Sequence, residues 1–139
     1  MKAYLGRRYR LSASHRLFCA SLSEAENRRV YGKCANPHGH GHNYIVEVVV
    51  GGEMDPVTAM VTDLVELDAC VGREVLEPFD QQNLNMLEAF REAVPTTENF
   101  ILEIERRLRR ALPERLSLTV RVEETSNNAF ETVAGGTDS

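Results

Sequence analysis

Tryptophan is absent from the 139-residue sequence, and aromatic residues together make up only 6% of it. Because 42% of the residues are hydrophobic, the chain can still bury a core, which must be mostly aliphatic. No apolar run reaches the roughly 18–20 residues that a membrane-spanning helix needs. The first residues also lack the apolar segment of a signal peptide. We therefore expect no membrane span, no membrane partner and no secretion.

Cysteine is scarce as well. Cys19, Cys34 and Cys70 are odd in number and far apart, which is not the pattern of a disulfide framework and suits the reducing cytoplasm. The length fits one domain of ordinary size. We expect this domain to span residues 1–134 and the tail, Gly135–Ser139, to be disordered.

The sequence also has no excess of basic residues, since its formal net charge is −5. This balance argues against a protein that binds nucleic acid. The charges are unevenly spread, because residues 1–33 hold 8 Lys and Arg against 2 Asp and Glu, whereas residues 34–139 hold 8 against 19. The basic third is either a solvated strand and loop or a local site for a polyanionic ligand.

Hydrophobic periodicity predicts an α+β fold. Residues 97–112 form an amphipathic helix in which acidic side chains come early and arginines late, as the helix dipole favours. Another helix, over residues 63–77, should begin at the N-cap Asp63 and end at Pro78. Alternating and β-branched patterns predict four strands, at residues 2–15, 42–52, 116–125 and 128–134.

This order of two strands, two helices and two strands predicts a four-stranded antiparallel sheet with both helices on one face. Residues 16–41 and 79–95 are polar and irregular, and we expect them to be loops. A loop as long as residues 16–41 is usually functional in a small domain. Because so small a sheet has two open edges, we expect these edges to pair between the subunits of an oligomer.

Three of the four histidines lie within five residues, in the segment 38–42. Alternate residues of a strand point to the same side, so His40 and His42 can present two imidazoles to one point. His15 ends the first predicted strand, a natural neighbour of that segment. Three imidazoles would form a tetrahedral zinc site with one open position, where zinc acts as a Lewis acid. The alternative is a histidine cluster without a metal. His38 stays outside the expected ligand set.

Two further side chains are candidates for chemistry. Cys34 lies six residues before His40 in a polar loop, and beside a dication its thiol should have a lowered pKa. It is then a metal ligand, a nucleophile or a base, unless it is an ordinary buried cysteine. Glu124 falls in phase with the apolar face of its strand. It either accepts paired hydrogen bonds from the NH groups of a ligand or lies in solvent beyond the strand.

The segment Thr96-Thr97-Glu98 opens the helix that is predicted over residues 97–112. Either threonine is a suitable N-cap, and Glu98 suits the first turn, so capping alone explains these residues. The exposed N-terminus of this helix is also a place where a ligand can bind.

Together these segments resemble the 6-pyruvoyltetrahydropterin synthase family. The resemblance implies the tunnelling fold, in which antiparallel sheets of several subunits close into a barrel. It also implies a homo-hexamer built from two trimers, with active sites between subunits. The matching segments cover nearly the whole chain: Ser12–His15, Gly32–Tyr44, Asp55–Thr58, Thr96–Asn99 and Glu124–Asn128.

The resemblance further implies a lyase. Its substrate would be 7,8-dihydroneopterin triphosphate, which loses triphosphate and rearranges by internal redox to 6-pyruvoyltetrahydropterin, in tetrahydrobiopterin biosynthesis. The basic N-terminal third would then face the triphosphate. The resemblance implies that the zinc ligands are His15, His40 and His42. It implies the catalytic residues Cys34, Asp80 and Glu124, of which Cys34 matches the base. It also implies the substrate-binding residues Thr96, Thr97, Glu98 and Glu124, and Glu124 with Thr97 and Glu98 matches the pterin anchor.

Three alternatives stay open. The related 6-carboxytetrahydropterin synthases of the queuosine pathway use the same substrate and zinc site, but their cysteine usually sits closer to His-Gly-His than Cys34 does here. The family also carries Asp-His before Asn-Leu, whereas here Gln81 follows Asp80. An amide cannot relay a proton, so the chain could be a zinc- and pterin-binding homologue with weak catalysis. A zinc hydrolase would leave Cys34 and Glu124 without roles.

Overall fold

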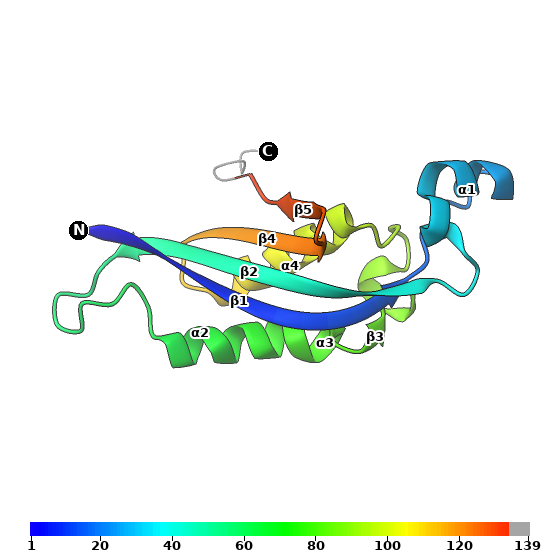
Figure 1. Ribbon diagram of the computed structural model, residues 1–139. Helices are drawn as coiled ribbons and strands as arrows, with labels where there is room; N and C mark the ends of the chain where they lie inside the picture. The colour runs from blue at the N-terminus through cyan, green and yellow to red at the C-terminus, as the bar shows by residue number, and fades with distance from the viewer. Residues whose placement is uncertain (134–139) are drawn as a thin grey trace.

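The computed structural model describes residues 1–133, so the tail that is expected to be disordered lies outside the described residues. All four predicted strands are present. β1 (Lys2–His15) and β2 (His40–Glu53) pair antiparallel along their whole length and form the long, curved hairpin of Figure 1. β4 (Ser117–Thr125) pairs with β2, and β5 (Asn128–Glu131) with β4, also antiparallel.

A fifth strand makes the sheet mixed, so the prediction of a four-stranded antiparallel sheet is wrong. β3 (Gln82–Asn83) runs parallel to the end of β1, and the strand order is β3-β1-β2-β4-β5. Two residues are too few to show a periodicity. The strand is fastened by the residues before it: Asp80 Oδ1 accepts the Ser12 N–H at 2.9 Å, and the Gln81 N–H donates to the Ser12 carbonyl at 2.6 Å.

Both predicted helices form, but the first runs further than expected. α2 (Leu64–Val71) begins at Asp63, whose carboxylate accepts two backbone N–H groups. It continues through a π-helical turn (Gly72–Leu76) into α3 (Glu77–Phe79). Pro78 therefore does not end the helix, because it lies in the first turn of α3, where the missing N–H of proline is tolerated. No helix of residues 1–133 is long and apolar enough to cross a membrane.

One face of the sheet is buried, and both long helices pack on it. Alternate residues of β2, from Val46 to Val50, are fully buried, as are Val120 and Val122 of β4. α2 and α4 (Thr97–Ala111) join the same core, in which Phe100 of α4 and Leu67 of α2 are buried. This arrangement of the helices agrees with the sequence pattern. Toward the start of β2, the buried face runs on into polar residues.

The segment between β1 and β2 is not the plain loop that we expected. It contains α1 (Glu24–Tyr31) and a 3₁₀ turn (Gly32–Ala35), which lie beyond the end of the sheet in Figure 1. Ser23 and Glu26 cap α1 reciprocally, with side chain to backbone hydrogen bonds in each direction. That Ser-x-x-Glu spacing was the available signal. Residues 79–95 are likewise structured, by β3 and two single 3₁₀ turns.

Candidate metal centre

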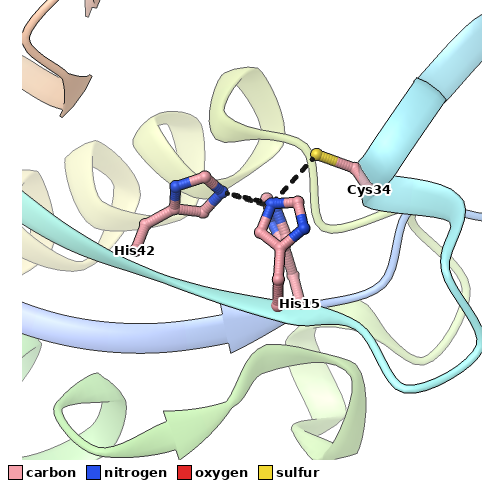
Figure 2. Close-up of side chains that lie close together, drawn as sticks. His15, Cys34 and His42 are labelled. Carbon is pink, nitrogen blue, oxygen red and sulfur yellow. Dashed lines mark hydrogen bonds between the residues drawn. The ribbon is translucent and has the colours of Figure 1, made fainter.

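Three imidazoles and one thiol converge at the end of the sheet where β1 ends and β2 begins. The Nε2 atom of His42 lies 2.9 Å from that of His40 and 3.2 Å from that of His15, and the Cys34 Sγ lies 3.3 Å from His40 Nε2. Figure 2 shows the side chains of His15, Cys34 and His42 pointing toward one another. The ligand atoms of all four residues lie within 4.8 Å of one another.

Strand pairing explains why these histidines meet. His15 is the last residue of β1 and pairs directly with His40, the first residue of β2. The chain reaches this register through Gly39, which has a positive φ of 67°. A Cβ atom at position 39 would lie 2.7 Å from the His15 carbonyl oxygen, so only glycine allows this approach. His42 follows two residues later on the same side of the strand.

The donor set fits a divalent metal ion. Nitrogen ligands at about 2.0–2.1 Å from a tetrahedral ion lie about 3.3 Å apart, close to the separations seen here. Burial lowers the pKa values of His15 and His42, which favours the neutral imidazoles that bind metals. His15 is only 1% exposed, and its Nδ1 lies 3.0 Å from the Pro95 carbonyl oxygen. Donation from Nδ1 leaves the Nε2 lone pair to face the centre.

Cys34 reaches the histidines on the 3₁₀ turn. Its carbonyl accepts the Leu17 N–H at 2.6 Å, which joins the turn to the residues that follow β1. The lowered thiol pKa is expected only beside a dication. Burial, followed by the negative charge of Glu124, raises the pKa of Cys34. A lowered thiol pKa therefore depends on the charge of a bound cation.

A carboxylate borders the histidines. Glu124 lies within β4, and its side chain is only 14% exposed, so the solvated alternative is wrong. Its Oε2 lies 3.8 Å from His42 Nε2 and accepts a hydrogen bond from the Thr97 hydroxyl at 2.5 Å. Thr97 is itself buried at the start of α4. Of the two candidate caps, Thr96 is the N-cap, since its hydroxyl accepts the Asn99 N–H, whereas Glu98 is exposed.

Other candidates lie apart from this group. The Asp80 carboxylate is engaged by the Ser12 backbone, and Asp80 is not among the clustered residues of its own chain. Gln81 adopts a left-handed backbone with φ of 62° and lines a cleft of about 430 Å³. His38, which was left out of the expected ligand set, is exposed and is not one of the clustered residues.

Sequence reasoning missed Tyr44, which lies on the same side of β2 as His40 and His42. The alternation of residues 40, 42 and 44 was the signal that could have found it. Fold and site together define an α+β protein with a group of side chains that could hold a metal ion and a largely buried carboxylate beside it.

Comparisons with known proteins identify the family. The family model described as 6-pyruvoyl tetrahydropterin synthase matches residues 4–134. The chain is 45% identical over 126 residues to 6-pyruvoyl tetrahydrobiopterin synthase of Poecilia reticulata, covering 90% of this chain and 86% of the relative. It is 44% identical over 128 residues to the Homo sapiens enzyme of that name, covering 91% and 88%. The solved structure of Caenorhabditis elegans 6-pyruvoyl tetrahydropterin synthase matches with a TM-score of 0.90, at 37% identity over 98% of this chain and 97% of that one. The chain belongs to the 6-pyruvoyl tetrahydropterin synthase family.

Proposed function

We propose that the protein is a zinc-dependent lyase that converts 7,8-dihydroneopterin triphosphate into 6-pyruvoyltetrahydropterin and triphosphate, in tetrahydrobiopterin biosynthesis. The observation that carries this proposal is the convergence of Cys34 and three histidines beside a largely buried carboxylate. A second line of support is that relatives at 44–45% identity are named 6-pyruvoyl tetrahydrobiopterin synthase.

His15, His40 and His42 would hold the metal ion, and a set of neutral imidazoles suits zinc. A bound zinc ion supplies Lewis acidity toward the hydroxyl and carbonyl oxygens of the substrate side chain. The residues around the centre then have to bind the pterin ring, move a carbon-bound proton and receive the triphosphate.

Glu124 is suited to anchor the pterin ring. One of its oxygens, Oε2, accepts the Thr97 hydroxyl, which leaves Oε1 for the NH groups on the ring. The carboxylate lies 3.8 Å from His42 Nε2, so a ring bound to it has its side chain near the histidines. We assign Thr96, Thr97 and Glu98 to the same ligand-binding edge, at the N-terminus of α4.

Cys34 is the group that we propose as the base. Its thiolate removes a proton from a side-chain carbon of the substrate, and the bond between carbon and the ester oxygen breaks as triphosphate leaves with the electron pair. Substrate and product differ only by the lost triphosphate and by internal proton shifts, so no external oxidant or reductant is consumed. Arg16, whose Nε donates to the Ala35 carbonyl at 3.2 Å, places a cation beside the Cys34 turn for the leaving triphosphate.

We propose that Asp80 assists proton transfer at the centre of another subunit, because Asp80 lies outside the cluster of its own chain. We propose a homo-hexamer of two trimers whose sheets close into a barrel. Support comes from the edges of the sheet: in residues 1–133, β1 has a strand neighbour on its outer side only at Ala13 and Ser14. We also propose that residues 1–134 are one domain, and that the protein, whose cysteines are all free, is cytoplasmic.

Gln81 favours a second candidate function, a zinc- and pterin-binding protein with weak catalysis. To decide, zinc-loaded protein is incubated with 7,8-dihydroneopterin triphosphate, and the pterin product is identified by mass spectrometry, with Cys34→Ala as the control. We expect 6-pyruvoyltetrahydropterin from the wild type and none from the variant. A 6-carboxytetrahydropterin product would assign the protein to the queuosine pathway instead. Pterin binding without any product would establish the second candidate.

A further inference from the structure

Tyr44 carries a buried hydroxyl group that the fold itself does not use. Its side chain is 1% exposed, and its hydroxyl is the one buried side-chain oxygen or nitrogen of the described residues without a hydrogen-bond partner. Leaving a buried donor unpaired costs folding free energy, so phenylalanine would be the better residue if position 44 served only the core.

The surroundings of Tyr44 hold the phenol at the metal centre. Its ring packs edge-on against Phe100, with ring centroids 5.2 Å apart, and lies 5.5 Å from the ring of His42. Both of these neighbours border the proposed pterin anchor, because Phe100 follows Thr97 by one turn of α4 and His42 Nε2 lies 3.8 Å from Glu124 Oε2. The phenol ring therefore contacts two side chains that border Thr97 and Glu124, the proposed pterin anchor.

The direction of the hydrogen bonds is fixed by what each group can donate. The Thr97 hydroxyl gives its single proton to Glu124 Oε2, so its oxygen has lone pairs left to accept another proton. Thr97 is 3% exposed, which limits competition from water. The Tyr44 hydroxyl is a buried donor that makes no hydrogen bond within residues 1–133. The two hydroxyls are not hydrogen-bonded here, so the contact requires the side chains to shift.

We propose that Tyr44 is a positioning residue for the pterin anchor, whose hydroxyl donates to Thr97 when a pterin binds and so fixes the carboxylate of Glu124. This inference rests on the proposed function and deepens it at the same site. The unpaired donor is satisfied only in the complex, so its hydrogen bond favours the bound state over the free one. The completed chain runs in one direction, from the phenol through the Thr97 hydroxyl to Oε2, and leaves Oε1 to the ligand.

The test is biopterin binding by zinc-loaded Tyr44→Phe protein, measured by calorimetry. We expect the dissociation constant to rise roughly 3–10-fold, with unchanged zinc content and a melting temperature equal to or above that of the wild type. Tyr9→Phe is the matched control, because the Tyr9 hydroxyl is already bonded to Asp68 Oδ1 at 2.7 Å. That variant should melt at a lower temperature and bind biopterin normally. Normal binding by Tyr44→Phe, or a loss of stability like that of the control, would overturn the inference.

A second pair of variants tests the route through Thr97. In a Thr97→Val background, Tyr44→Phe should have no further effect on biopterin affinity, whereas in Thr97→Ser, which keeps the hydroxyl, the full effect should remain. An equal effect of Tyr44→Phe in Thr97→Val and in the wild type would refute the chain. Wild-type protein that does not bind biopterin would overturn the proposed function itself, which separates that failure from failure of the Tyr44 role alone.

Discussion

Replacing Glu124 by glutamine should abolish tight pterin binding while leaving the metal centre intact. The change is nearly isosteric, but it exchanges one acceptor oxygen for an NH₂ donor and removes the negative charge. Hydrogen bonds to a charged group contribute about 1.5–3 kcal/mol each. With the side chain only 14% exposed, water cannot replace the lost acceptor. We therefore expect biopterin affinity to fall about 10–160-fold, which is that energy range expressed as a ratio of dissociation constants.

The assay is titration of zinc-loaded Glu124→Gln protein with biopterin, together with metal analysis. Glu123→Gln makes the same change of charge on the opposite face of β4, where the carboxylate is 34% exposed and lies 3.5 Å from Arg121. This control should bind biopterin within about twofold of the wild type, as expected for an exposed pair. Wild-type affinity in Glu124→Gln would refute the anchor. An equal loss in the control would show that net charge, and not the position of the carboxylate, sets the affinity.

Three further variants test the metal, the relay and the fold. His40→Ala should lose bound zinc in metal analysis, and full occupancy would contradict its assignment as a ligand. Gln81→His should speed triphosphate release, by up to the roughly 10²–10⁴-fold that a positioned acid or base contributes, and an unchanged rate would contradict the relay argument. Asp68→Asn should lower the melting temperature at pH 7. Hydrogen bonds from Arg7 and Tyr9 lower the pKa of Asp68, so its stabilisation is present above the unfolded pKa of about 3.9. The difference from wild type should vanish as the pH falls through the lower folded pKa, and a constant difference would refute that cause.

Long periodic segments could be predicted from the sequence, and short ones could not. The fourteen-residue strand β1 carries an alternating pattern, and α4 carries a continuous apolar stripe, so both were found close to their true bounds. β3 has two residues and depends on a tertiary contact between Asp80 and Ser12. The residues of α1 are mostly polar, and only the capping box indicates a helix.

The candidate site divides in the same way. His40 and His42 share a strand face by period alone, and His15 follows once the two strands are paired. The contact between Thr97 and Glu124 joins residues 27 positions apart, so no local pattern shows it. The same period places Tyr44 on the face of His40 and His42, but its unpaired hydroxyl can be seen only in the packed structure.

The central claim is that one metal ion, held by the three histidines, works with Cys34 to release triphosphate. The most direct measurement titrates metal-free protein with zinc and follows triphosphate release from 7,8-dihydroneopterin triphosphate. We predict that the rate rises in proportion to added zinc, levels off at about one ion per chain, and stays at background in Cys34→Ala. A full rate in metal-free protein, or an undiminished rate in the zinc-loaded cysteine variant, would contradict the claim.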